Sequence, residues 1–210
     1  MFSSTAAVYG EPEALPIAEE APTRPLSPYG AAKRAAELYL GCIGPLRGLS
    51  TVCLRLFNVY GPRQDPHSAY AGVVAAFLSR ALAGAPLTVF GDGRQTRDLI
   101  YAGDVARALV LAAGVSSDRE IGAGSIGQVV CNVGSGSEVS IAALASLVRS
   151  AAVACGARPG AVVHAEGRAG EIARSVAVTA QAQELLGFVP EVELAEGLRR
   201  TARWMSGAGG

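Results

Sequence analysis

The sequence has no excess of charge of either sign: its 18 basic and 18 acidic residues cancel, and only 17% of the 210 residues are charged. This balance provides no electrostatic footprint for nucleic acid, and we expect no such partner. No apolar run approaches the ~20 residues that a membrane span needs, and the amino terminus lacks the features of a signal peptide. Because half of the residues are apolar, the chain can bury a sizeable core, and we expect a cytoplasmic protein without a membrane partner.

Metal ligands are also scarce. The two histidines, His67 and His164, have no cysteine or carboxylate cluster beside them. The cysteines match no metal-ligand spacing and are expected to be buried small hydrophobes: Cys42, Cys53, Cys131 and Cys155. We therefore expect no metal site, and the lack of a G-x-S-x-G motif disfavours a Ser-His-Asp hydrolase.

Lysine is nearly absent. Of the 18 basic residues 17 are arginines, and the only lysine is Lys33. Since arginine replaces lysine easily on a solvated surface, a retained lysine can mark a position that needs a compact ammonium group. The alternative is a surface lysine left by chance.

Predicted strands and helices alternate along the chain, which is typical of an α/β fold with a largely parallel sheet. Strands are expected at residues 50–60, 87–90, 98–101, 129–133 and 161–164. Helices are expected at residues 29–42, 73–82, 105–113, 140–154, 179–186 and 194–205. Residues 8–28 and 114–127 are expected to be loops, residues 91–93 a turn, and Asp104 the N-cap of the helix that follows it.

Tyr29 and Lys33 lie four residues apart near the start of a predicted helix, so one helix face carries both. An ammonium group and a helix N-terminus beside a tyrosine favour its phenolate. Such a pair is an acid/base that can take a proton from a hydroxyl and return it. The Y-x-x-x-K pattern alone is weak evidence, because it recurs by chance.

Longer segments in a fixed order are more specific. They are S-S-T-A-A-V-Y-G (3–10), S-P-Y-G-A-A-K (27–33), R-L-F-N-V-Y-G-P-R (55–63), G-D-G-R-Q-T-R-D-L-I-Y-A-G-D-V-A (91–106), G-R-A-G-E-I-A-R-S-V-A-V-T (167–179) and E-L-L-G-F (184–188). Together they resemble the extended short-chain dehydrogenase/reductase family, most closely its NAD-dependent epimerase/dehydratase members of the UDP-glucose 4-epimerase type. The resemblance covers essentially the whole chain. It implies a Rossmann-type doubly wound sheet, NAD as cofactor and a UDP-sugar as substrate.

The resemblance also implies roles for particular residues. The catalytic residues would be Thr5, which bonds the reacting hydroxyl, Tyr29, the acid/base, and Lys33, which binds the nicotinamide ribose; Phe57 would also contact the cofactor. The substrate would be held by Ser4, Asn58, Arg97, Arg168 and Glu171. Guanidinium forks suit a diphosphate. The alternative for Arg97 is a surface salt bridge with Asp98, and for Arg168 and Glu171 a solvated loop pair.

The residues after Thr5 distinguish between reactions in this family. Dehydratases and decarboxylases that resemble this chain usually carry an acid there, whereas this chain has Ala6 and Ala7. The resemblance therefore implies epimerisation at C4 of a nucleoside-diphosphate sugar, with hydride abstracted and returned. The alternatives are a dehydratase or reductase of the same family, and a non-catalytic protein that retains only sugar-nucleotide binding.

The family opens with a strand, a G-x-x-G-x-x-G turn and a helix that hold the pyrophosphate, and no such segment precedes Phe2. Residues 129–140 do not replace it, because Val139 stands at the third glycine position. On the order of 110 residues would then be missing. We therefore expect a fragment that binds NAD poorly and is inactive alone, whereas the full-length parent is expected to be a homodimer.

The expected domain organisation follows from the same resemblance. Residues 1–62 would form the end of the Rossmann-type domain, with the Tyr/Lys helix. Residues 63–206 would form the substrate-binding region, interleaved with Rossmann elements at about 94–134, before a flexible tail at residues 207–210.

Overall fold

The computed structural model describes residues 1–66, 68, 72–114, 127–167, 170 and 172–207. The strands are β1 (Phe2–Thr5), β2 (Thr51–Leu56), β3 (Asn58–Tyr60), β4 (Leu87–Phe90), β5 (Thr96–Tyr101), β6 (Gln128–Val133), β7 (Glu138–Ser140) and β8 (Val162–Ala165). The helices are α1 (Pro28–Leu46), α2 (Val73–Leu82), α3 (Ala102–Gly114), α4 (Ile141–Ala154), α5 (Ala180–Leu186) and α6 (Leu194–Met205), with a 3-10 turn η1 (Ala6–Val8). The α/β prediction is confirmed.

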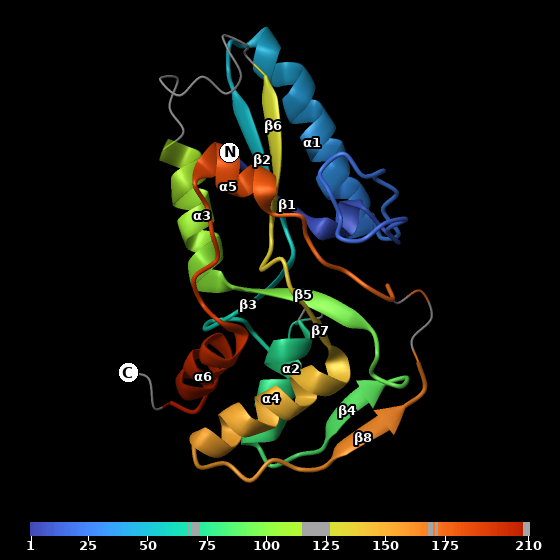
Figure 1. Ribbon diagram of the computed structural model, residues 1–210, viewed down its shortest axis with the longest axis vertical. Coiled ribbons are helices and arrows are strands. Elements are labelled where there is room, and N and C mark those ends of the chain that lie inside the picture. Colours follow the sequence, from blue (N-terminus) through green and yellow to red (C-terminus); the bar gives the residue numbers. More distant parts are fainter. Residues whose placement is uncertain (67, 69–71, 115–126, 168–169, 171, 208–210) are drawn as a thin grey trace.

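The upper part of the molecule in Figure 1 is a parallel sheet in the order β1-β2-β6. Helix α1 lies on one side of it, and α3 and α5 lie on the other. The first five residues of β2 are buried, as expected for a parallel strand covered on both faces. Leu54, Cys131 and Val133 pack there with residues of α3 and α5.

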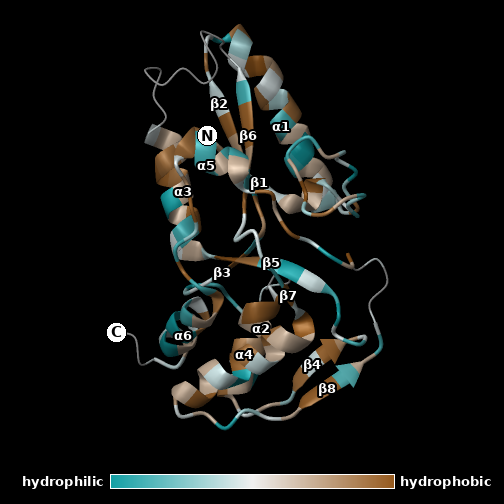
Figure 2. Ribbon diagram, viewed as in Figure 1, coloured by the Kyte–Doolittle hydropathy of each residue, from teal (hydrophilic) through white to brown (hydrophobic). Residues whose placement is uncertain are grey.

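The lower part contains a mixed sheet, β3-β5-β7, and a parallel pair, β4-β8. Helices α2, α4 and α6 pack around a second core that includes Phe77, Leu78, Leu144, Val148 and Leu198. Figure 2 shows β4 and α2 as largely hydrophobic, and the outer side of α6 as hydrophilic. Apolar burial therefore holds this part together.

At two connections the chain passes from one sheet to another. The single strand expected at residues 50–60 is two strands, because the chain leaves the upper sheet at Phe57 and enters the mixed sheet. The predicted turn at residues 91–93 is present, and it joins strands of different sheets: β4 pairs with β8, whereas β5 pairs with β3 and β7. Neither change of sheet is visible in local hydrophobic periodicity.

The prediction that Asp104 caps its own helix is wrong. Helix α3 begins at Ala102, so Asp104 lies inside the first turn. Its buried carboxylate instead accepts hydrogen bonds from the backbone N–H groups of Glu191 (3.2 Å) and Val192 (3.0 Å). It therefore ties α3 to the segment that precedes α6.

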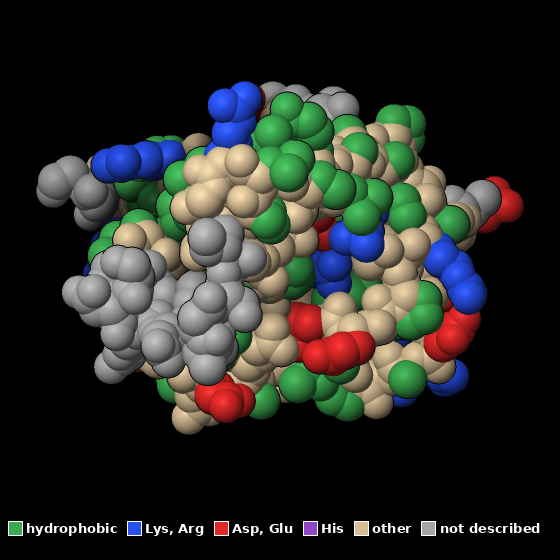
Figure 3. Space-filling view, turned by 90° about the horizontal axis from the view of Figure 1, so that it is seen from above, with side chains coloured by type: hydrophobic (Ala, Val, Ile, Leu, Met, Phe, Trp, Pro, Cys, Tyr) green, Lys and Arg blue, Asp and Glu red, His purple; other side chains and the backbone are tan. Residues whose placement is uncertain are grey.

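Helix α1 begins as the sequence predicts and extends four residues further, to Leu46. Ser27 is its N-cap: the Ser27 hydroxyl accepts from the N–H of Gly30 at 3.1 Å, and Pro28 occupies the first turn. The outward side of α1 exposes Leu38 and Tyr39. Figure 3, which views the molecule from above, shows hydrophobic side chains scattered over this face among polar and charged ones. Among the described residues, no helix is long and apolar enough to cross a membrane.

Gly30 of α1 lies close against η1. A Cβ at this position would lie 2.6 Å from the carbonyl oxygen of Ala7. We expect Gly30→Ala to lower the free energy of unfolding by about 1–3 kcal/mol, because the backbone must shift to relieve the clash. Urea denaturation measures this, with Gly114→Ala as the control, since a Cβ there meets nothing within 4 Å. Equal effects of the two substitutions would contradict the prediction.

Candidate active site

The candidate catalytic residues lie where α1 meets the carboxyl edge of the upper sheet. Strands β1 and β2 are parallel and end side by side, with Thr5 paired to Leu56. The Thr5 hydroxyl oxygen accepts a hydrogen bond from the N–H of Ala7 at 3.2 Å, which caps η1 and fixes the side chain. In α/β sheets ligands bind at this edge, outside the carboxyl ends of the strands.

A cavity of about 540 Å³ opens at this edge. Five of the predicted site residues line it, namely Ser4, Thr5, Tyr29, Phe57 and Asn58. Tyr29 is 48% exposed, so a ligand can reach it. The structure therefore brings the predicted hydroxyl and the predicted acid/base into one cavity from segments 24 positions apart in the chain.

Lys33 lies beside Tyr29, as the helical spacing predicts. Its ammonium nitrogen Nζ is 5.9 Å from the centroid of the Tyr29 ring and 4.9 Å from that of Phe2. The same nitrogen donates a hydrogen bond of 2.8 Å to the carbonyl oxygen of Ser3 in β1. This bond ties the middle of the α1 face to the strand that ends at Thr5.

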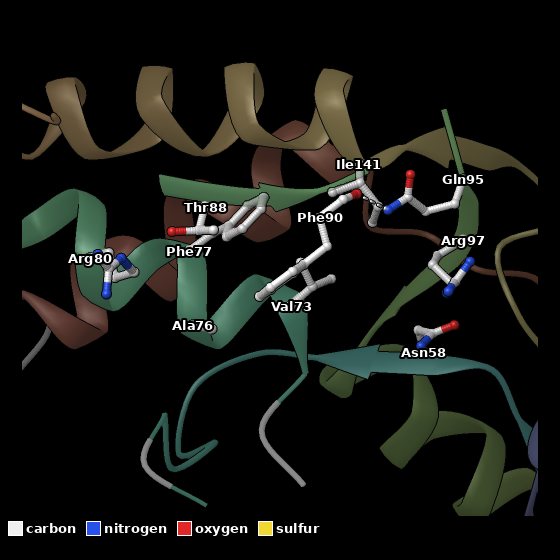
Figure 4. Close-up of a pocket in the computed structure, with 10 residues that line it drawn as sticks. All are labelled: Asn58, Val73, Ala76, Phe77, Arg80, Thr88, Phe90, Gln95, Arg97 and Ile141. Atoms are coloured by element: carbon white, nitrogen blue, oxygen red, sulfur yellow. Dashed lines mark hydrogen bonds between the residues drawn. The ribbon is translucent and has the colours of Figure 1, made fainter. Parts of the chain in front are cut away.

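A second cavity, of about 420 Å³, adjoins the first (Figure 4). The two cavities share Asn58 and Val73. Arg97 lies beside Asn58 at one end in the close-up, and Arg80 lies at the other. The Nη1 atom of Arg97 donates to the carbonyl oxygen of Ile172 at 2.8 Å, which holds the guanidinium in place. Two arginines give this cavity a lining that suits an anionic ligand.

The remaining predicted residues differ in what the structure shows of them. Arg168 and Glu171 lie outside the described residues. The Ser4 hydroxyl is 2.5 Å from the Oε1 atom of Glu37, to which it donates, so it is engaged inside the protein. The alternative for Arg97 was a surface salt bridge with Asp98. Asp98 is fully buried and directly follows Arg97 in β5. Since neighbouring residues of a strand face opposite sides, this arrangement does not favour a surface salt bridge between them.

A buried ion pair behind the cavity was missed by sequence reasoning. Glu37 and Arg55 are 0% and 3% exposed, and their two hydrogen bonds measure 3.0 and 2.9 Å. Arg55 also donates to the Tyr9 hydroxyl (3.0 Å) and to the carbonyl oxygen of Glu19 (2.9 Å). Two features of the sequence indicate these residues. Glu37 lies four positions after Lys33, just as Lys33 lies four positions after Tyr29, and Arg55 is a charged residue within an otherwise apolar strand.

The charged form of Glu37 is stabilised by these contacts. Burial alone would raise the pKa of the Glu37 carboxyl. Hydrogen bonds from Arg55 and Ser4, together with the charge of Arg55, outweigh burial and hold that pKa below its ordinary value. The carboxylate is therefore ionised wherever the protein is folded near neutral pH.

This shift has a consequence for stability as a function of pH. A carboxyl whose pKa is lowered by folding stabilises the protein at any pH above its pKa in the unfolded chain, which is about 4.3 for Glu. The stabilisation disappears as the pH falls through the folded value. We expect the free energy of unfolding to fall less steeply between about pH 5 and 3 in Glu37→Gln than in the wild type. Urea unfolding at each pH measures both curves, and parallel curves would contradict the assignment.

Gln64 is a second residue that sequence reasoning missed, and nothing in its sequence context marked it. Its side chain lines the 540 Å³ cavity. Its amide oxygen Oε1 is buried and has no hydrogen-bond partner among the residues that the structure describes. Because an unsatisfied buried acceptor costs free energy, the cavity is suited to a ligand that brings a hydroxyl or N–H donor.

These features define a Rossmann-type α/β protein with a Tyr–Lys site at the carboxyl edge of its sheet. The chain belongs to the NAD dependent epimerase/dehydratase family, whose model matches residues 1–134. The sequence is 41% identical over 202 residues to the UDP-glucose 4-epimerase of Mycolicibacterium smegmatis, covering 96% of this chain and 60% of that protein.

Solved structures agree with this assignment. The UDP-glucose 4-epimerase of Thermotoga maritima with UDP-glucose matches with a TM-score of 0.86 and 36% identity, over 99% of this chain and 62% of that one. The UDP-glucose 4-epimerase of Thermus thermophilus in complex with NAD gives a TM-score of 0.82 and 41% identity, over 99% and 63%. The chain thus spans about three fifths of the length of these relatives.

Proposed function

We propose that the two adjoining cavities together bind a nucleoside-diphosphate sugar, and that the site serves NAD-dependent epimerisation at C4 of a UDP-glucose or UDP-galactose type substrate. The observation that carries the proposal is the shared wall at Asn58 and Val73. This wall joins the cavity lined by the hydroxyl groups of Thr5 and Tyr29 to the cavity lined by the guanidinium group of Arg97. A sugar nucleotide has the same division, with neutral hydroxyls at one end and a diphosphate next to them.

In this orientation the chain supplies the proton chemistry. The Tyr29 phenolate takes the proton of the C4 hydroxyl as C4 is oxidised and returns a proton to the same oxygen when C4 is reduced. The Thr5 hydroxyl donates a hydrogen bond to that oxygen, and the Lys33 ammonium lies beside the Tyr29 ring. Inversion requires the 4-keto sugar to turn over within the cavity of about 540 Å³.

The described residues fit only one end of the cofactor. Tyr29, Lys33 and Phe57 are suited to its nicotinamide-ribose end, where bound NAD would supply the acceptor and donor of hydride. The Gly-rich turn that follows β6 does not suit the pyrophosphate, because the Asp98 carboxylate already accepts the N–H groups of Ser135 and Gly136. We propose that these 210 residues alone bind the sugar nucleotide but bind NAD weakly and do not turn over.

Two other functions remain alternatives: a dehydratase or reductase of the same family, and sugar-nucleotide binding without catalysis. Ala6 and Ala7 favour epimerisation over dehydration, because they place no acid beside the reacting carbon. The pairing of Thr5 with Tyr29 in one cavity favours a catalytic ancestry over simple binding.

Calorimetric titration of the 210-residue chain with UDP-glucose and, separately, with NAD tests the proposal. We expect heat of binding from UDP-glucose, much weaker binding of NAD, and no conversion of UDP-glucose to UDP-galactose. Absence of sugar-nucleotide heat would contradict the proposed site. NAD-dependent turnover would contradict the proposal that this chain is inactive alone.

Other expectations also stay proposals. The division at residues 62 and 63 and the cytoplasmic location follow from the resemblance and the composition. A homodimer of the full-length protein is compatible with the exposed side of α1, where Leu38 and Tyr39 are 54% and 67% exposed. Sedimentation of the full-length protein measures its oligomeric state.

A further inference from the structure

Asp98 is a fully buried carboxylate held by four donors. Its Oδ1 atom accepts from the N–H (2.6 Å) and the hydroxyl (2.7 Å) of Ser135. Its Oδ2 atom accepts from the N–H of Gly136 (3.0 Å) and of Ala177 (3.1 Å). Donors from two distant segments therefore converge on one charge.

The segment around Ser135 has the form of an anion-binding nest. Gly136 has a positive φ of 71°, and its N–H and that of Ser135 point to the same carboxylate. Gly134 comes so close that a Cβ there would lie 2.6 Å from Oδ2 of Asp98. The nest is thus filled by an anion that belongs to the chain itself.

Asp98 is linked to Arg97 through the segment of residues 172–177. Ala177, at one end of this segment, donates to Asp98. Ile172, at the other end, provides the carbonyl oxygen that Arg97 bonds in the 420 Å³ cavity. Between them the carbonyl oxygen of Ala173 accepts from the N–H of Thr96 at 3.0 Å. Three consecutive residues of β5 therefore hold one segment.

We infer that Asp98 is a positioning residue for substrate binding: it acts as an internal anion that fastens residues 172–177 to β5 and so directs Arg97 into the cavity. Its effect on substrate rests on the function proposed above. Its effect on residues 172–177 does not, because it concerns only contacts within the chain. The two parts can be measured separately.

The test uses Asp98→Ala, which empties the nest, with sodium formate as a small carboxylate to refill it. Hydrogen–deuterium exchange of residues 172–178 reports whether the segment is held, and calorimetry with UDP reports the binding site. Asp98→Asn is the second variant. Its side-chain NH₂ group would face backbone N–H groups, which are also donors, and the side chain would leave no room for formate. Asp104→Ala is the matched control, since Asp104 is also a buried carboxylate that accepts two backbone N–H groups, away from both cavities.

We expect faster exchange of residues 172–178 in Asp98→Ala, a UDP affinity lower by roughly tenfold, and recovery of both on adding formate but not sodium chloride. Asp98→Asn should show the same losses without recovery, and Asp104→Ala should leave the exchange of this segment and the UDP affinity unchanged. Unaltered exchange in Asp98→Ala, or exchange that formate does not slow, would overturn the inference. If the wild type itself does not bind UDP, the proposed function fails, whereas the exchange results still decide whether Asp98 holds the segment.

Discussion

Replacing Glu37 with leucine is expected to lower the free energy of unfolding by about 3–5 kcal/mol, enough to unfold a marginally stable domain. The substitution leaves the Arg55 guanidinium, which is 3% exposed, without its counter-ion. It also leaves the Ser4 hydroxyl without its acceptor. Urea denaturation followed by circular dichroism measures the loss.

A double variant distinguishes the lost ion pair from simple loss of packing. Glu37→Leu combined with Arg55→Met removes both charges, so it should recover most of the stability that the single substitution loses. Glu196→Ala is the matched control, because Glu196 is likewise a carboxylate paired with arginines, Arg199 and Arg200, but on the exposed side of α6. We expect little change there. A double variant as unstable as Glu37→Leu would contradict the assigned role of the pair.

Replacing Arg97 with alanine is expected to weaken UDP binding by roughly 10- to 100-fold, which corresponds to the loss of charge-assisted hydrogen bonds. Arg97 is the predicted diphosphate ligand that the described structure places in a cavity, where it lies beside Asn58. Calorimetry with UDP measures the affinity. Lysine at this position should restore part of it, because the charge returns without the planar fork.

Two comparisons show whether the loss is specific to the phosphates. Uridine carries no phosphate, so its weaker binding should be nearly the same in the wild type and in Arg97→Ala. Arg94→Ala removes an arginine three positions away whose side chain is 90% exposed, and it should leave UDP binding unchanged. Equal losses for uridine and UDP would indicate that Arg97 supports the fold of the cavity and does not grip the diphosphate.

Local pattern predicted the parts of the site that depend on one element. The helical spacing of Tyr29 and Lys33 placed both on one face of α1, and the structure confirms that they are neighbours. The apolar period also predicted α2 with the bounds that the structure has, Val73–Leu82. The resemblance implied that Thr5 and Tyr29 belong to one site; both line the 540 Å³ cavity, and their catalytic roles stay a prediction.

Features that depend on two distant segments were not predictable in the same way. The carboxylate of Asp104 accepts hydrogen bonds from Glu191 and Val192, which lie 87 and 88 positions later in the chain. The helical pattern around Asp104 does not indicate these distant partners. The Asp98 nest joins β5 to segments at Ser135 and Ala177, and in the sequence its glycines resemble only part of a dinucleotide-binding motif. The pairing of Glu37 with Arg55 is likewise set by the packing of α1 on β2.

A crystal structure of the 210-residue chain with UDP-glucose tests most directly whether the two adjoining cavities bind the sugar nucleotide. The diphosphate should lie beside Arg97 and Asn58, with the C4 hydroxyl of the glucosyl group between Thr5 and Tyr29. UDP-glucose bound away from these two cavities, or with its nucleotide against Tyr29, would contradict the proposed site.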